Sequence, residues 1–297
     1  MTHPMKLKIC SNGLGSQSIA MLIVGTRGEF PVDASITGDT GWEQDCLWSN
    51  GRRTTAKTYF VEVVVPLCAA YGITAHFVRS VDKSKVALPN LIDHVRAVVA
   101  AGKLNSLKIP LFGSKGGRMR QVCTDKWKIR AIHQEARRMG AKHLLSAQGI
   151  HAGEIWRRAR GKFIGMDGKF SIYQDTVVRK GVETPTKWCT HFYPLADLKM
   201  NREDCQKLCL DAGVPYIVSS QCDGCPHKDL PRWERTAPET LHELSELEKL
   251  FNGEFFFTSE RIPLLDALEV MRKRRAEKPV EFEQELDFGC KNNICGV

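Results

Sequence analysis

The stretch of sequence that decides the fold is residues 6–25, which read KLKICSNGLGSQSIAMLIVG. Alternating apolar side chains at 6–10 predict a short strand. Small and polar residues at 11–18 predict a loop, and the apolar run that begins at Ile19 predicts a helix. The sequence therefore begins with a strand, a glycine-rich loop and a helix.

The rest of the first 200 residues repeats this alternation. We expect further strands at 34–37, 74–78 and 142–146. We expect helices at 52–71, with a break or kink at Pro66, and at 126–139, ending at Gly140. Strands that alternate with helices predict an α/β fold, a mostly parallel sheet with helices on both faces. Ligands of such sheets bind beyond the carboxyl ends of the strands.

The alternation of predicted strands and helices ends at about residue 200. We expect a helix at 201–212 with Asn201 as its cap, a cysteine-bearing loop at 222–225 and a charged helix at 238–251. The prediction is therefore a first domain at 1–200 and a mostly helical, cysteine-bearing region at 201–297, packed against it.

Composition narrows the class of protein. The 297 residues are 42% hydrophobic and 26% charged, which is typical of a globular chain and argues against a disordered or fibrous one. No apolar run reaches the roughly 18 residues of a membrane span, and residues 1–8 do not resemble a signal peptide, so we expect a cytoplasmic protein. The 43 Lys and Arg against 34 Asp and Glu, a net charge of +9, favour an anionic partner.

The loop at 11–18 has the composition of a phosphate-binding loop. Small residues let backbone amides approach an anion, hydroxyls add donors, and a helix N-terminus adds positive potential. A merely structural turn is the alternative interpretation. The loop lacks the Lys of a Walker A motif, which argues against an ordinary P-loop NTPase.

Three further segments follow in order: ITGDTGWE at 36–43, RQVCTDKWKI at 120–129 and QGIHAGEIWRR at 148–158. Together with the loop at 11–18, they resemble the motifs of the PAPS reductase-like branch of the ATP-pyrophosphatase (PP-loop) superfamily. The likeness runs from about residue 6 to residue 198, and residues 193–195 resemble the terminal Pro-Leu strand of that family. Gln17 stands where many members have an aspartate.

The resemblance implies an adenine nucleotide alpha hydrolase-like fold that binds ATP and Mg²⁺. The residues it assigns to the nucleotide are Ser11, Gly13, Gly15, Ser16, Gln17, Ser18, Asp39, Thr40 and Gly149. Asp39 is also expected near the reaction centre or the Mg²⁺. Arg157 or Arg158, with Lys126 or Lys128, would neutralise charge that develops at the phosphate.

Eleven cysteines in a chain of this length favour a metal site or reactive thiols over a disulfide framework. We expect Cys10, Cys46 and Cys68 to be small core residues, and Cys205 and Cys209 to pack on one face of their helix.

The remaining cysteines are candidates for chemistry. Cys222-Asp223-Gly224-Cys225-Pro226 is a C-x-x-C turn, and Cys290 and Cys295 supply two more thiols. Four thiolates would complete a [4Fe–4S] cluster or a structural zinc site. A site without metal is the third possibility. Resemblance to the sulfonucleotide reductases suggests a rival set in which Cys123 is a ligand; otherwise Cys123 is a catalytic sulfur carrier.

Basic residues surround two of these motifs. They are Lys115, Arg118, Arg120, Lys126, Lys128 and Arg130 around the second motif, and Arg157, Arg158, Arg160 and Lys162 around the third. A cleft between them would be strongly positive, which suits nucleic acid as well as a small sulfonucleotide.

The leading hypothesis is an ATP-dependent sulfur-transfer enzyme that adenylates and thiolates nucleic acid. The resemblance favours DNA phosphorothioation over tRNA thiolation, with a cysteine desulfurase as the sulfur donor. The alternatives are a thiol-dependent sulfonucleotide reductase and a non-catalytic nucleotide-binding module with structural zinc.

Overall fold

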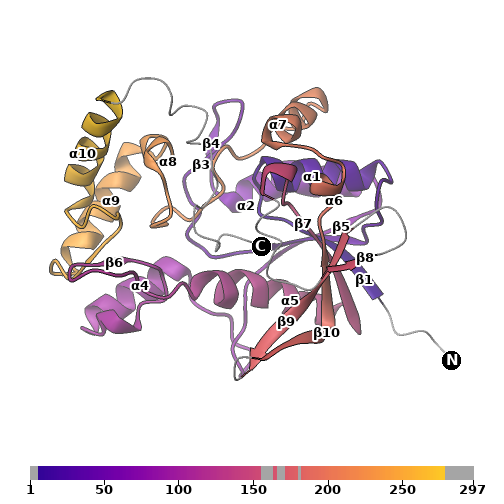
Figure 1. Cartoon of the computed structure of the whole chain (residues 1–297), viewed down its shortest axis with the longest axis horizontal. Helices are drawn as coiled ribbons and strands as arrows, with labels where there is room; N and C mark the ends of the chain where they lie inside the picture. Colours follow the sequence, from indigo (N-terminus) through magenta and orange to yellow (C-terminus); the bar gives the residue numbers. More distant parts are fainter. Residues whose placement is uncertain (1–5, 155–162, 166–170, 180–181, 278–297) are drawn as a thin grey trace.

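A computed structural model describes residues 6–154, 163–165, 171–179 and 182–277 of the chain (Figure 1). Its largest element is a seven-stranded sheet of order β5-β2-β1-β7-β10-β9-β8. The bounds of these strands are β1 Lys6–Ser11, β2 Ala34–Gly38, β5 Thr74–Val78, β7 His143–Gln148, β8 Phe163–Gly165, β9 Ser171–Arg179 and β10 Val182–Phe192. The strands β5, β2, β1, β7 and β10 are all parallel, whereas β9 and β8 add two antiparallel strands at one edge. The predicted α/β class with a parallel central sheet is confirmed.

Alternating side chains of β1 explain why the sheet carries helices on both faces. Leu7 and Ile9 point to one face, where they pack with Ile132 of helix α5 (Arg130–Arg138). Cys10 points to the opposite face and packs in a core with helix α1 (Ser16–Thr26). A strand that is apolar on both sides is buried between two layers of helices.

Helix α1 begins earlier than the sequence predicts. Ser16, Gln17 and Ser18 form its first turn instead of belonging to the loop. Gly15 is the extended residue before the helix, and Leu14 has a positive φ of 66° that is held by a bond from its N–H to Asn12 Oδ1 at 2.8 Å. The chain therefore turns within 12–15 and leaves the first helical amides at the end of β1.

The predicted helix at 52–71 is shorter and irregular. Its first residues belong to a small hairpin of β3 (Cys46–Leu47) and β4 (Arg53–Thr54). Helix α2 (Ala56–Tyr59) then passes through a π-helical turn η1 (Phe60–Val64) into α3 (Val65–Ala69). The ring of Pro66 clashes with a carbonyl one turn earlier in a regular α-helix. The wider π-helical turn therefore lies just before Pro66, and the Val65 N–H donates to the Phe60 carbonyl, five residues back.

The end of β10 corrects a second expectation. Residues 193–195 were expected to be a strand, but β10 ends at Phe192 and Pro194 opens the short helix α6 (Pro194–Asp197). Proline is favoured in the first turn of a helix because its missing N–H has no partner to lose there.

A second core lies beside the sheet and is built mainly from helices (Figure 1). It joins the middle of the chain to its last third, and Trp127, Trp233, Phe251 and Phe257 are completely buried in it. Its elements are α4 Leu91–Ala100, η2 Leu104–Ser106, β6 Phe112–Gly113, η3 Thr124–Ile129, α8 Leu230–Glu234, α9 Pro238–Lys249, β11 Phe255–Phe256 and α10 Leu264–Ala276. The helix predicted at 126–139 is the π-helical η3 followed by α5.

The chain after residue 200 contributes to both cores. Helix α7 (Arg202–Asp211) has the predicted Asn201 cap, completed by Asp204, and packs on α1. Cys205 and Cys209 are buried there, and Cys10, Cys46 and Cys68 lie in the same core, as predicted. The boundary at residue 200 stays a prediction. Within the described residues, no helix has the length and apolar character to cross a membrane.

Candidate active site

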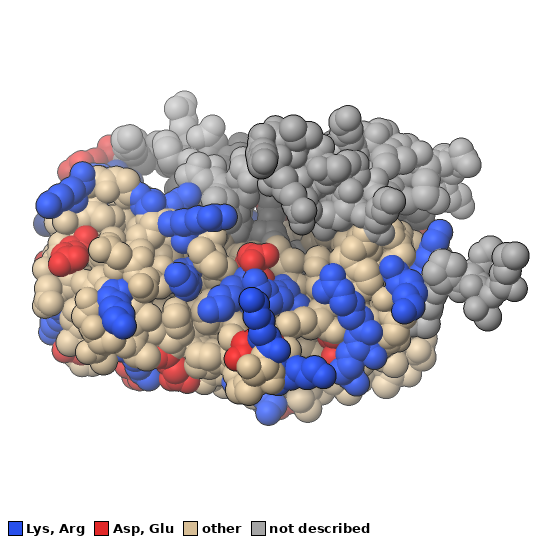
Figure 2. All heavy atoms as spheres, turned by 90° about the horizontal axis from the view of Figure 1, so that it is seen from below, with Lys and Arg blue, Asp and Glu red and all other residues tan. Residues whose placement is uncertain are grey.

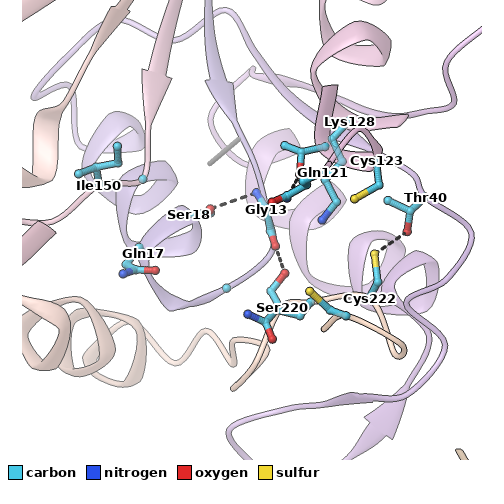
Figure 3. Close-up of a pocket in the computed structure, with 15 residues that line it drawn as sticks. Gly13, Gln17, Ser18, Thr40, Gln121, Cys123, Lys128, Ile150, Ser220 and Cys222 are labelled. Carbon is cyan, nitrogen blue, oxygen red and sulfur yellow. Dashed lines mark hydrogen bonds between the residues drawn. The ribbon is translucent and has the colours of Figure 1, made fainter. Parts of the chain in front are cut away.

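One pocket lies where the sheet reverses its strand order, at the carboxyl ends of β1 and β7. The chain proceeds from β1 to β2 and β5 on one side and later adds β7 and β10 on the other, so the point between β1 and β7 is where ligands of parallel sheets bind. The pocket has a volume of about 150 Å³. Its lining residues are Gly13, Gly15, Gln17, Ser18, Thr40, Gln121, Cys123, Thr124, Lys128, Gly149, Ile150, Ser220, Gln221, Cys222 and Cys225 (Figure 3).

The first wall, which we call the cradle wall, is formed by Gly13, Gly15, Gln17 and Ser18 with Gly149. Ser18 turns its hydroxyl back to accept a hydrogen bond from the Gly13 N–H at 3.0 Å. The Gly13 carbonyl in turn accepts a bond from the Ser220 hydroxyl (Figure 3). No side chain caps the first turn of α1. Its amides and the dipole of the helix therefore give this wall positive potential without a charged side chain.

The second wall, which we call the thiol wall, carries Cys123, Cys222 and Cys225. Cys123 immediately precedes η3, and the other two thiols flank the C-x-x-C turn. The Cys222 thiol donates to Thr40 Oγ1 at 3.4 Å, and in Figure 3 the sulfur atoms of Cys123 and Cys222 point toward the same space. Cys123 and Cys222, which are 99 positions apart in sequence, thus line the same pocket.

A cation lies between the two walls. Lys128 lines the pocket, and its Nζ is 2.7 Å from Oε1 of the buried Glu43. The backbone of Lys128 packs tightly on the end of β2, because a Cβ added to Gly38 would lie 2.8 Å from Lys128 Cα. Glu43 also lies 3.8 Å from the Cys222 sulfur. One carboxylate therefore holds the ammonium group and contacts a thiol.

Burial governs the protonation of the thiols. It raises the pKa of Cys123 to about 11, with a further rise from Cys225 and an opposing effect of Lys128. Burial likewise raises the pKa of Cys222 well above its ordinary value, again opposed by Lys128. Both groups are neutral thiols at neutral pH, and Lys128 is the main group in the site that favours their thiolates.

Asp223 and Gly224 hold the C-x-x-C turn in place through contacts with Gln44 and Trp42. Asp223 Oδ2 accepts a bond from the Gln44 N–H at 2.9 Å, and burial raises the pKa of this carboxyl to about 6. Gly224 packs on Trp42 so closely that a Cβ would lie 2.3 Å from the ring. The turn is therefore joined to the segment that follows β2.

A second polar chain supports the other end of the thiol wall. His227 Nε2 lies 3.0 Å from Gln121 Oε1, and Gln121 Nε2 donates to Thr124 Oγ1 at 2.7 Å. Burial, and then the nearby Arg118, lower the pKa of His227 to about 4. A neutral imidazole that donates from Nε2 orients the Gln121 amide toward the pocket-lining Thr124.

Several predicted residues do not line the pocket. Ser11 and Ser16 are buried beside it. Asp39 accepts a bond from Arg79 through Oδ2 at 2.6 Å and one from the Gly41 N–H through Oδ1 at 2.6 Å. Lys126 is not a pocket residue, which selects Lys128 of the two lysines. Arg157, Arg158, Cys290 and Cys295 lie outside the described residues.

The structure adds residues that the sequence did not single out. They are Glu43, Gln121, Thr124, Ile150, Ser220 and Gln221. Glu43, Gln121, Thr124 and Ile150 belong to the quoted motifs, in which neighbouring residues were assigned roles. Ser220 and Gln221 precede the C-x-x-C turn and have no such signal, since they reach the cradle only through the folded chain.

The thiol wall provides the donor chemistry of a soft metal site, because three thiols line one pocket. Within the described part of the chain, however, no three His, Cys, Asp or Glu side chains form a group that could hold a metal ion. A ligand set that includes Cys290 or Cys295 stays a prediction.

No protein-family model matches the chain, and no curated protein matches its sequence.

Proposed function

We propose that this protein is an ATP pyrophosphatase that activates an oxygen of nucleic acid for replacement by sulfur. The observation that carries the proposal is the shared pocket: the cradle residues Gly13 and Ser18 face the same space as Cys123 and Cys222. A phosphate-binding wall opposite a thiol wall suits a reaction in which a nucleotide is cleaved and sulfur is delivered. The four motifs of the PAPS reductase-like family support the same reading.

The cradle wall fits the phosphates of ATP. The backbone amides at the start of α1 are uncharged donors, and the neighbouring Gly13 and Gly15 have no side chain, which lets phosphate oxygens approach closely. Mg²⁺ bound with the nucleotide would offset the charge of the phosphates. Gln17 contributes an amide in place of a carboxylate, so the metal needs ligands from the nucleotide or other residues.

Lys128 is the proposed catalytic cation. When the acceptor oxygen attacks the α-phosphorus, the bond to the bridging oxygen breaks and pyrophosphate leaves, carrying negative charge. A preorganised ammonium group, held by Glu43 at 2.7 Å, stabilises that charge without first having to be ordered. A thiol reductant releases sulfide from the persulfide of the sulfur donor, and this sulfide attacks the atom that bears the adenylated oxygen. The bond from that atom to sulfur forms, its bond to the oxygen breaks, and the oxygen leaves as part of AMP.

The thiol wall is the proposed entry point for sulfur. A [4Fe–4S] cluster would be held by Cys222 and Cys225 together with Cys290 and Cys295, or with Cys123 in place of one of these two, and zinc is the alternative metal for the same donors. A bound cluster supplies sulfur or redox chemistry to the pocket. A cysteine desulfurase is the proposed partner, and DNA is the favoured acceptor over tRNA.

The same geometry gives a second candidate, reduction of a sulfonucleotide by a thiol. The two functions differ in their products. The purified protein, prepared without oxygen, is incubated with ATP and duplex DNA or tRNA, and in parallel with a sulfonucleotide and a dithiol. We expect AMP and pyrophosphate from the first mixture. ADP and phosphate, or no product, would contradict the pyrophosphatase, and sulfite from the second mixture would identify the reductase.

The metal is tested by the absorption spectrum and metal content of the same preparation. Single Ser substitutions at Cys123, Cys222, Cys225, Cys290 and Cys295 form the series. A broad band near 400 nm, lost in four of the five variants, is expected for a cluster. Zinc alone, or no metal, would contradict it.

A further inference from the structure

Three cations lie close to Cys123 of the thiol wall, and none of them lines the pocket. Lys126 and Arg130 are four residues apart, so they lie on one face of the helix formed by η3 and α5. Lys108 lies beside them, since its carbonyl accepts bonds from the N–H groups of Val122 and Cys123 at 3.1 and 3.0 Å. We call Lys108, Lys126 and Arg130 the basic ridge.

One cation of the basic ridge, Lys126, packs on an aromatic ring of the second core. Lys126 Nζ lies 4.9 Å from the ring centre of the buried Trp127, and His94 stacks on the same ring at 5.3 Å. Trp127 is itself anchored by a bond from its indole N–H to the Pro89 carbonyl at 2.9 Å. Lys126 therefore packs on a buried aromatic ring of the second core, and Lys108 and Arg130 are close enough to lower its pKa.

The charges of the basic ridge are poorly compensated. Among the described residues, the one ion pair to this ridge joins Arg130 to the exposed Asp125 at 3.9 Å. Burial, together with Lys108 and Arg130, lowers the pKa of Lys126. Like charges four residues apart on a helix destabilise it. In the view from below, the side of α4 and α5, Lys and Arg gather across the middle with few carboxylates between them (Figure 2).

We propose that the basic ridge binds the sugar–phosphate backbone of the nucleic-acid acceptor and directs it to the thiol wall. Adjacent phosphates would supply the negative charge that Lys108, Lys126 and Arg130 lack. Because the Lys108 carbonyl accepts a bond from the Cys123 N–H, a nucleic-acid backbone bound on the ridge would lie near Cys123 of the thiol wall. The inference rests on the proposed function, which supplies the class of acceptor.

The test compares two variants with the same loss of charge. One carries Lys108→Gln, Lys126→Gln and Arg130→Gln on the ridge. The other carries Lys57→Gln, Lys207→Gln and Lys273→Gln at exposed positions on α2, α7 and α10. Binding of a fluorescent duplex DNA, and of an RNA hairpin in a second arm, is measured by anisotropy over a range of salt concentrations, and thermal unfolding verifies the fold.

We expect the ridge variant to bind at least tenfold more weakly than the wild type. The slope of log K against log salt should become shallower by about 2 to 3, because each phosphate contact contributes about 0.9 on duplex DNA. The control variant should retain most of the affinity. The two arms show which nucleic acid is bound.

Equal losses in both variants would attribute binding to net charge and overturn the inference. No binding by the wild type, or a ridge variant that binds within twofold of it, would overturn it as well. Pyrophosphate release is measured separately: wild-type protein that binds through the ridge without releasing pyrophosphate contradicts the proposed function and leaves the ridge assignment intact.

Discussion

The two walls of the pocket are built in opposite ways. The cradle wall comes mostly from one stretch of eight residues and offers backbone amides and hydroxyls. The thiol wall gathers Cys123, Cys222 and Cys225 from two distant segments and holds titratable groups. In the structure, the cradle wall is set mostly by local chain geometry, whereas the environment of the thiols depends on Glu43 and Lys128, which the tertiary fold brings beside them.

The largest effect is expected at the cation between the walls. Lys128→Met should reduce pyrophosphate release by about 10²- to 10³-fold, because a preorganised positive charge is lost while Glu43 stays buried without its partner. The measurement is turnover at saturating ATP and acceptor. Lys57→Met, at an exposed position of α2, is the matched control, and equal activity of the two variants would remove Lys128 from the chemistry.

The reactivity of Cys123 tests the buried environment of the thiol wall. In metal-free protein, a Cys123 pKa of about 11 against an ordinary value of 9.0 predicts alkylation about a hundredfold slower than in the unfolded chain near pH 8. The thiolate forms as the pH rises toward the folded-state pKa, so the rate should increase tenfold per pH unit until then. Mass spectrometry after timed iodoacetamide treatment measures it. A rate that has already levelled off at pH 8 would contradict the assigned environment.

Two glycine-to-alanine substitutions compare the cradle wall with the packing around Lys128. Gly38→Ala should lower the free energy of unfolding by about 1–3 kcal/mol, because the new methyl group meets the Lys128 backbone at 2.8 Å. Gly13→Ala meets only the Ser18 hydroxyl at 3.5 Å, so it should leave stability nearly unchanged and weaken nucleotide binding by filling the cradle. Denaturant unfolding and nucleotide titration of both variants test the pair. The reverse pattern would show that the cradle is a structural turn.

The smallest effect is expected at Thr40. Thr40→Val removes the acceptor of the Cys222 thiol and of the Trp42 N–H, which should cost about 0.5–1.5 kcal/mol of stability. Thr54→Val, which removes a partner of the Trp48 indole away from the pocket, is a comparable control. Metal retention should fall in the Thr40 variant alone. Unchanged metal retention would limit Thr40 to a structural role.

The features that the sequence could predict are those encoded locally, and the features that it could not predict depend on the tertiary fold. The parallel sheet, the glycine-rich loop and the core cysteines are encoded locally: by the alternation of strands and helices over the first 200 residues, by the glycines within 11–18, and by the sequence context of each cysteine. The Glu43–Lys128 pair and the meeting of Cys123 with Cys222 depend on the second core, in which segments more than 100 residues apart pack around Trp42 and Trp127. Periodicity carries no information about such distances. The start of α1 was misplaced because Ser16, Gln17 and Ser18 read as loop residues until their amides are seen at the end of β1.

One short segment sets the spacing between the walls. The Ile217 N–H donates to the Leu14 carbonyl, the Val218 N–H to Leu47, and the Ser220 hydroxyl to Gly13, before the chain reaches Cys222. Because residues 217, 218 and 220 make these contacts within a few positions of Cys222, the length of 217–222 matters more than most of its side chains. We therefore expect a library of this segment to accept many substitutions and few insertions, a pattern of tolerance opposite to that of an ordinary surface loop.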